Sequence, residues 1–275
     1  MDLFIPSSSS IFIILADFLD PCDLAALSQT ARKFRDACGV EYVFHPNDDG
    51  WDGDARDFSQ FYNAKSISYQ GASMEDDDKY TFLKLKSLTK ITINDGKLHS
   101  LKGFETLTNL RILDLDTNEF ADLSPIANLR DLKVLNISCN DISDISPLKN
   151  LCNLVELDLS ANDIKDLSPL ENLINLQKLD FSCSEDDLYL LRNLVNMRKL
   201  RILCHSDSDL DYLTGMHNLE ILKLTSSKLC KNMHLLDNFR KLRKYEITEY
   251  FCTKDEKIIK TRPSRRNPIG DVNEN

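Results

Sequence analysis

Apolar residues recur along this chain with a long period that no single helix or strand explains. A unit of 22 residues repeats, and its clearest copies begin at Leu110, Leu132 and Leu154. Flanking copies keep spacings of 21 or 22 residues and begin at Leu88, Leu176, Met197 and Leu219, with looser copies near Ala64 and Leu242. Such a period predicts a solenoid, in which stacked units bury apolar side chains that no unit could bury alone.

The first half of each unit reads LxxLxL, in which apolar and polar residues alternate. This alternation predicts a short strand with one buried face. After two further residues the best copies carry an asparagine, at Asn118, Asn140 and Asn162. An asparagine side chain there can hydrogen-bond the neighbouring backbone and form a ladder along the solenoid, so we predict a structural role for it.

The second half of each unit carries the pattern Asp-Leu/Ile-Ser-Pro-Leu/Ile, at residues 122–126, 144–148 and 166–170. Serine is a favoured N-cap, and proline suits the first helical position because the N–H that it lacks would be unpaired there. We therefore predict that serine caps a short helix or helical turn on the convex side of each unit.

The opening of the unit is the leucine-rich-repeat signature. Over roughly residues 88–247 the unit resembles the internalin and phosphatase-regulator class of leucine-rich repeats. The resemblance implies an α/β fold, a right-handed solenoid with a parallel β-sheet on its concave face, preceded here by a small three-helix unit.

Four segments follow from this pattern. We predict a helical unit at 1–40, a linker and N-terminal cap with an irregular first repeat at 41–87, the solenoid with its C-terminal cap at 88–252, and a disordered tail at 253–275. The side chains expected to close the C-terminal end are Tyr245, Ile247, Tyr250 and Phe251. The tail is polar and locally basic, so a solvated tail is predicted, with a nuclear-import or docking signal as the alternative.

The segment from Ile11 to Gly39 has helical rather than repeat character and divides into three short helices. Asp20 before Pro21 is a helix-start signal, and Gly39 is a stop. Its first helix carries more apolar surface than so small a unit can hide, which predicts a partner. The apolar residues concerned are Ile11, Ile14, Leu15, Phe18 and Leu19.

These residues resemble an F-box from about Ile5 to Ala37. The matching elements are Leu19-Asp20-Pro21, Asp23-Leu24, Ala26-Leu27-Ser28 and Arg32-Lys33-Phe34-Arg35. The match departs at its start, where the Leu-Pro pair of the family should fall on Ser7-Ser8 and Ile5-Pro6 lies two residues too early.

The F-box resemblance implies binding to a Skp-type adaptor of cullin ubiquitin ligases, with the repeats capturing a client protein. The adaptor-binding residues that it implies are Leu15, Phe18, Leu19, Pro21, Leu24 and Leu27. We therefore predict a substrate-recruiting ligase subunit that holds its client close and performs no chemistry itself. The alternative is a stand-alone leucine-rich-repeat interaction scaffold or regulator whose N-terminal helices only cap the solenoid.

Polar residues between the inward leucines are expected on the concave face, where a client would bind. The candidate client-binding residues are Asp114, Asp116, Asn136, Asp158, Asp180, Arg201 and Lys223. Asp158 and Asp180 should be neighbours that a lysine or arginine of the client could bridge, so we expect a client with a basic patch. Alternatively, Leu-Asp-Leu-Ser is a common form of this repeat, and its aspartate is solvated and silent.

The net charge of −10 disfavours nucleic acid and anionic lipid as partners. The apolar run from Ile11 to Leu15 is too short to span a bilayer and follows no basic stretch, so we expect an intracellular protein, cytoplasmic or nuclear. The eight cysteines form no CxxC pair, which argues against a disulfide framework or a zinc module.

Candidate chemistry is sparse. Cys183, Cys204 and His205 should lie on adjacent units, but these three side chains leave a zinc site one ligand short. The sequence has no glycine-rich phosphate loop. We therefore predict no catalytic residue, no metal and no cofactor, and the alternative is an enzyme that uses this Cys/His cluster.

Overall fold

The computed structural model describes residues 41–44, 65–70, 82–183, 187–204, 209–226, 231–250 and 256–262 of the chain. Its strands form one eleven-stranded sheet in which spatial order follows chain order. Each neighbouring pair from β1 to β10 is parallel, whereas β11 runs antiparallel to β10. The sheet is therefore the open, mostly parallel sheet that a stack of repeats produces.

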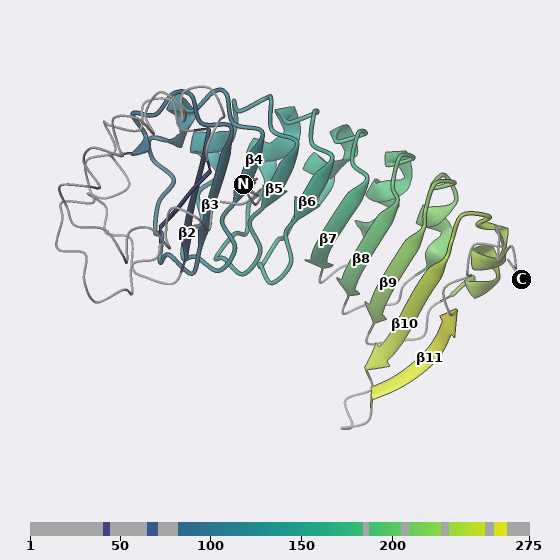
Figure 1. The fold of residues 1–275 in the computed structure, drawn as a ribbon. Coiled ribbons are helices and arrows are strands. Elements are labelled where there is room, and N and C mark those ends of the chain that lie inside the picture. The colour runs from purple at the N-terminus through teal and green to yellow at the C-terminus, as the bar shows by residue number, and fades with distance from the viewer. Residues whose placement is uncertain are drawn as a thin grey trace, which may run out of the picture.

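The strands occur once per repeat, and short 3-10 helices occur between them. The strands are β1 (Glu41–Phe44), β2 (Ser66–Gln70), β3 (Lys90–Asn94), β4 (Ile112–Asp114), β5 (Val134–Asn136), β6 (Glu156–Asp158), β7 (Lys178–Cys183), β8 (Lys199–Cys204), β9 (Ile221–Ser226), β10 (Lys244–Tyr250) and β11 (Glu256–Arg262). The 3-10 helices are η2 (Phe104–Thr106), η3 (Ser124–Ile126), η4 (Ser146–Asn150), η5 (Ser168–Asn172), η6 (Asp187–Asn193), η7 (Leu210–Leu213) and η8 (Met233–Asn238). Figure 1 shows the strands side by side in a curved row, with the helical turns along the outer side of the curve.

The inward leucines of successive strands form one continuous core between the sheet and the turns. Leu113 and Leu115 are completely buried, and the equivalent positions of β5 to β9 are at most 1% exposed. At the N-terminal end of this core, Phe82 packs edge-to-face against Phe104 with ring centroids 5.9 Å apart. The predicted alternation of buried and exposed strand positions is confirmed.

The predicted asparagine ladder is present inside the solenoid. Oδ1 of Asn118 accepts hydrogen bonds from the backbone N–H groups of Gly96 and Leu98, each at 3.1 Å. Its Nδ2 donates to three backbone carbonyls of its own and the preceding repeat. Asn140 and Asn162 each donate in the same way to three carbonyls. These side chains thus replace backbone partners where the chain leaves the sheet, and the structural role is confirmed.

The residue before each ladder asparagine adopts the left-handed conformation. The φ angles are 56° at Thr117, 52° at Cys139 and 53° at Ala161. For a residue with a side chain this conformation costs about 1–2 kcal/mol. The cost is sustained because the turn directs the following asparagine into the core, where its hydrogen bonds offset it.

The predicted serine cap of the helical turns is wrong. Ser124 is the first residue of η3 and Leu123 is its N-cap, so the side chain that accepts hydrogen bonds at this end comes from Asp122, one residue earlier. Oδ1 of Asp122 accepts from the Ser124 N–H and Oδ2 accepts from the Ser124 hydroxyl, both at 2.8 Å. The pairs Asp144–Ser146 and Asp166–Ser168 repeat this arrangement. The same two hydrogen bonds lower the pKa of Asp144, because they favour the ionised carboxylate.

The ends of the sheet extend beyond the regular repeats. β2 lies where the loose copy near Ala64 was expected, and β1 adds a strand from the segment predicted as a cap. Residues 256–262, which the sequence assigned to a disordered tail, instead form β11 along the free edge of β10. Of the residues expected to close this end, Ile247 is completely buried. The helical unit predicted at 1–40 lies outside the described residues.

Candidate protein-binding surface

The strand register brings six of the seven predicted client-binding residues into one row across the sheet, whereas Asp116 lies past the end of β4, two residues beyond Asp114. Equivalent positions pair directly from strand to strand, and Asp158 lies opposite Asp180, as expected. The row comprises Thr92, Asp114, Asn136, Asp158, Asp180, Arg201, Lys223 and Glu246. Glu246 was not among the predicted residues, because the repeat around Leu242 is too loose to fix its register. We call the sheet face that carries this row the concave face; it follows the inner side of the curve in Figure 1.

Hydroxyl groups of the repeats hold the carboxylates of the acidic half in place. The Ser138 hydroxyl lies 2.6 Å from Oδ1 of Asp116 and 2.7 Å from Oδ1 of Asn136. The Ser160 hydroxyl donates to Oδ1 of Asp158 at 2.6 Å. The serine of the Leu-Asp-Leu-Ser pattern therefore orients an aspartate, which remains able to accept further hydrogen bonds.

Asp180 lies at the boundary between the acidic and basic parts of the row. Its side chain is only 8% exposed, and Oδ2 lies 2.7 Å from Nη1 of Arg201. Burial, with a smaller contribution from the neighbouring Asp158 carboxylate, raises the pKa of Asp180 to about 6, although Arg201 and Lys178 act in the opposite direction. We expected a lysine or arginine of a client to contact this carboxylate. Arg201 of the chain itself already occupies that place.

The substitution Asp180→Asn is expected to flatten the pH dependence of stability. Because the folded state binds this proton more tightly than the unfolded state, wild-type stability should rise as pH falls from about 6 towards 3.8 and be lost as pH rises through about 6. At pH 7.5 the variant should be more stable by about 1 kcal/mol, less than the roughly 3 kcal/mol of the full shift, because the Arg201 contact weakens. Urea unfolding between pH 4 and pH 7.5 measures this difference.

A matched control is Asp131→Asn, which removes the same charge from an exposed position. This control should shift the whole profile slightly and leave its shape unchanged. If Asp180→Asn retained the wild-type slope between pH 4 and pH 6, Asp180 would not be the group that titrates there.

The C-terminal part of the concave face is basic and carries one apolar side chain. The side chains of Arg201 and Lys223 are 63% and 43% exposed, and Lys223 lies 3.4 Å from Glu246. Leu203 is 40% exposed and stands in register between Ser182 and Thr225. A single leucine in a column of small polar residues is the sequence signal for this feature, although Leu203 was not among the predicted client-binding residues.

The predicted Cys/His cluster and the predicted adaptor-binding residues lie partly or wholly outside the described residues. Cys183 and Cys204 are register partners on β7 and β8, whereas His205 lies outside the described residues. Within the described ranges, no group of three or more His, Cys, Asp or Glu residues could hold a metal ion. No helix in those ranges has the length and apolar character needed to cross a bilayer. The six predicted adaptor-binding residues, Leu15 to Leu27, also fall outside the described part of the chain.

Comparison with known proteins identifies the repeats. The family profile described as leucine-rich repeats in two copies matches residues 130–172. These residues are leucine-rich repeats. A search of curated protein sequences found no match. The comparisons give no support for an F-box.

Similar solved structures show the same fold. An internalin (inlF) from Listeria monocytogenes aligns with a TM-score of 0.63 at 22% identity, over 74% of this chain and 60% of its own. Internalin C2 of the same species aligns with a TM-score of 0.56 at 29% identity, over 61% of this chain and 74% of its own. The plant peptide hormone receptor RGFR1, in complex with RGF2, aligns at 0.53 and 15% identity, over 76% and 35%. The chain thus spans 60% of the first internalin's length, and its predicted likeness to the internalin class is confirmed.

Proposed function

We propose that this chain is a protein-interaction scaffold whose concave face captures one partner through two oppositely charged segments. Leucine-rich-repeat folds are typically binding scaffolds rather than enzymes, and the plant receptor was solved with a bound RGF2. The observation that carries the proposal is the change of sign along one in-register row. Asp114 and Asp158 lie on one side of the Asp180–Arg201 pair, and Lys223 lies on the other, with Glu246 after it at the end of the row.

The dimensions of the row suit an extended segment of the partner. At a strand spacing of about 4.8 Å, the five intervals from β4 to β9 span about 24 Å, the length of roughly seven extended residues. Basic side chains of the partner would lie over Asp114 and Asp158. Acidic side chains would lie over Arg201 and Lys223.

The contribution of each residue follows from its exposure. Arg201 and Lys223 are exposed enough to contact a partner directly, and Leu203 offers an apolar anchor beside them. Asp180 is buried and paired, so it acts by holding Arg201 in place. The serine hydrogen bonds fix Asp116 and Asp158 before binding, which reduces the entropy lost when a partner arrives.

The test reverses the basic half of the row. The double variant Arg201→Glu/Lys223→Glu is expected to lose partners that wild type retains, and the affinity for any recovered partner should fall at least tenfold, or about 1.4 kcal/mol. Affinity capture with quantitative mass spectrometry, followed by calorimetry on the recovered protein, measures both effects.

The control places the same charge reversal on the turns, in the variant Arg130→Glu/Lys149→Glu. Both residues are exposed and lie away from the concave row. Equal retention of partners by wild type and by the concave-face variant would overturn the proposal. Equal loss in both variants would show that general charge, rather than this face, governs binding.

A second candidate function is the substrate-recruiting subunit of a cullin-type ubiquitin ligase, acting in the cytoplasm or nucleus. Its support is the F-box-like sequence around Leu19-Asp20-Pro21. Purified protein would then bind a Skp-type adaptor, and Phe18→Asp/Leu19→Asp would abolish binding without changing the circular dichroism. Failure of folded wild type to bind would reject this candidate and leave the concave-face scaffold intact.

A further inference from the structure

A second asparagine ladder runs along one flank of the solenoid, at the residue that precedes the repeats beginning at Leu110, Leu154, Leu176 and Met197. The repeat beginning at Leu132 carries Asp131 at this position instead. Nδ2 of each asparagine donates to a backbone carbonyl of the preceding repeat at 2.8–2.9 Å. The pairs are Asn109 with Lys86, Asn153 with Arg130, Asn175 with Cys152 and Asn196 with Ile174. Unlike the inner ladder, this one lies at the surface.

The outer ladder changes at its C-terminal end. Lys241 occupies the asparagine position of its repeat, and its Nζ donates to Oδ1 of Asn218 at 2.7 Å. Asn218 therefore uses its oxygen, and its Nδ2 makes no hydrogen bond within the described part of the chain. At this end of the ladder, the ammonium group of Lys241 and the free Nδ2 of Asn218 thus take the place of the hydrogen bond from an asparagine amide to a backbone carbonyl.

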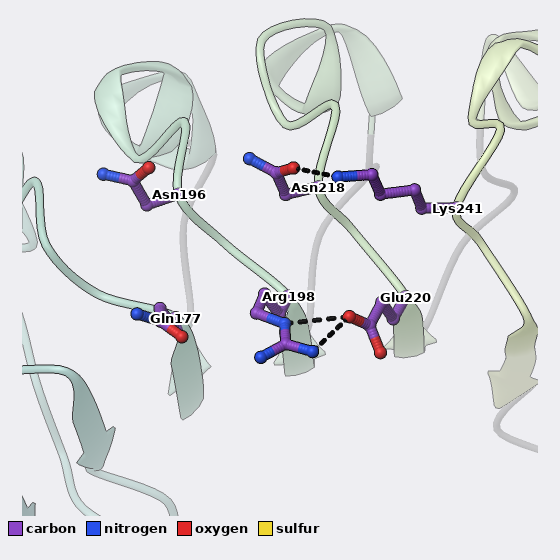
Figure 2. Close-up of a pocket in the computed structure, with 6 residues that line it drawn as sticks. All are labelled: Gln177, Asn196, Arg198, Asn218, Glu220 and Lys241. Atoms are coloured by element: carbon purple, nitrogen blue, oxygen red, sulfur yellow. Dashed lines mark hydrogen bonds and ion pairs between the residues drawn. The ribbon is translucent and has the colours of Figure 1, made fainter.

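A pocket of about 270 Å³ opens where the ladder changes. It is lined by Gln177, Asn196, Arg198, Asn218, Glu220 and Lys241. Figure 2 shows Asn196, Asn218 and Lys241 in a row at the turns, above Gln177, Arg198 and Glu220 where the strands begin. Nε of Arg198 lies 2.8 Å from Oε1 of Glu220, and the second contact of the guanidinium uses the same oxygen.

Positive charge exceeds negative charge around this pocket. Glu220 is the one carboxylate among the six lining residues, and its side chain is 17% exposed. The Arg198 hydrogen bond is the main cause that lowers the pKa of Glu220, and the charges of Arg198, Arg243 and Lys199 also lower it. Two of the six lining residues, Arg198 and Lys241, are cationic and one is a carboxylate, in a chain whose net charge is −10. The pocket therefore favours an additional anion.

Two exposed apolar side chains belong to the same flank, and Val195 directly precedes the pocket residue Asn196. Ile174 and Val195 directly precede the ladder residues Asn175 and Asn196 on successive repeats, and they are 51% and 46% exposed. They belong to the few large hydrophobic residues that the described surface leaves uncovered. Exposed apolar side chains therefore occur on the flank that carries the pocket, and the backbone carbonyl of Ile174 accepts from the pocket residue Asn196.

We propose that this flank is a second docking site, separate from the concave face, for an extended acidic segment of a partner protein. A glutamate or aspartate of that segment enters the pocket and pairs with Arg198 and Lys241. The free amide of Asn218 donates a hydrogen bond to the same carboxylate. A leucine-like side chain of the segment, nearby along its chain, covers Ile174 and Val195.

The experiment titrates the full chain with a fluorescein-labelled synthetic peptide of alternating glutamate and leucine and follows fluorescence anisotropy. Wild type is expected to bind this peptide and not its glutamine counterpart. Lys241→Asn restores the usual residue of the repeat, so the fold should be kept, and it should weaken binding at least about fivefold. Lys241→Arg should retain binding.

Two controls separate this site from the rest of the surface. Lys149→Asn removes one exposed positive charge from another turn and should leave the Kd within about twofold. Lys165→Asn, at an exposed position outside both proposed surfaces, should also leave the Kd within about twofold. The proposal is overturned if wild type fails to bind up to millimolar peptide, if the glutamine peptide binds equally, or if either control weakens binding as much as Lys241→Asn.

Discussion

Replacing Asn118 by alanine is expected to lower the free energy of unfolding by about 3 kcal/mol. The side chain is 7% exposed, and its oxygen accepts the buried N–H groups of Gly96 and Leu98. Alanine leaves both donors unpaired, at about 1–3 kcal/mol each, partly relieved by local rearrangement. Urea unfolding followed by circular dichroism, extrapolated to water, gives the difference.

The matched control for this prediction is Asn109→Ala in the outer ladder. Asn109 is exposed and makes a single hydrogen bond, 2.8 Å to the carbonyl of Lys86, so its loss should cost under about 1 kcal/mol. Equal costs for the two substitutions would contradict the distinction between an inner ladder that replaces backbone partners and an outer ladder that only ties neighbouring repeats together.

The inner ladder could be predicted from the sequence because it depends only on an asparagine that recurs at the same place in each regular repeat. An integer repeat places Asn118, Asn140 and Asn162 one above another whatever the details of the turns. The register of the concave row follows for the same reason, since Leu113 pairs with Leu135 and Leu135 with Leu157. Where the spacing is regular, the period alone fixes which residues share a face.

The helical caps could not be assigned in this way. The Asp-Leu-Ser-Pro pattern contains two good capping residues, and capping preferences rank aspartate and serine about equally. Asp122 caps η3 because the turn begins one residue earlier than expected, which makes the Ser124 N–H the unpaired donor. That difference depends on backbone geometry and not on residue type.

β11 and the Asp180 ion pair depend on contacts between distant residues. The segment 256–262 is polar and basic in composition, and it forms a strand because the edge of β10 supplies backbone partners. Asp180 and Arg201 were both predicted on the concave face, but the depth of the carboxylate depends on the packing of its neighbours. The face on which Asp180 and Arg201 lie could be predicted from the sequence, but their contact with each other could not.

The two proposed binding surfaces have different origins in the repeat. The concave row uses the variable strand positions, which are free to change because the inward leucines and the inner ladder carry the fold. The flank pocket forms where the outer ladder is interrupted by Lys241, at a position whose usual asparagine has a structural contact. The flank pocket is therefore marked by a residue that departs from the usual residue of the repeat. The concave row instead lies at strand positions where the repeat pattern specifies no residue type.

Replacing Phe104 by alanine is expected to lower the free energy of unfolding by about 3–5 kcal/mol. The side chain is completely buried and packs edge-to-face against Phe82, with ring centroids 5.9 Å apart. Alanine would leave a cavity between η2 and the first described turn of the core. Phe104→Leu keeps most of the volume and should cost under about 1.5 kcal/mol.

The damage from Phe104→Ala should remain near the N-terminal repeats. Each repeat of a solenoid contacts only its neighbours, so an interface lost beside Phe104 need not destabilise distant repeats directly. Hydrogen exchange in the variant is therefore expected to accelerate in β3 and β4, while β8 and β9 keep their wild-type protection. Uniform acceleration across the sheet would instead show that all the repeats unfold as one cooperative unit, and the local account of stability would then be wrong.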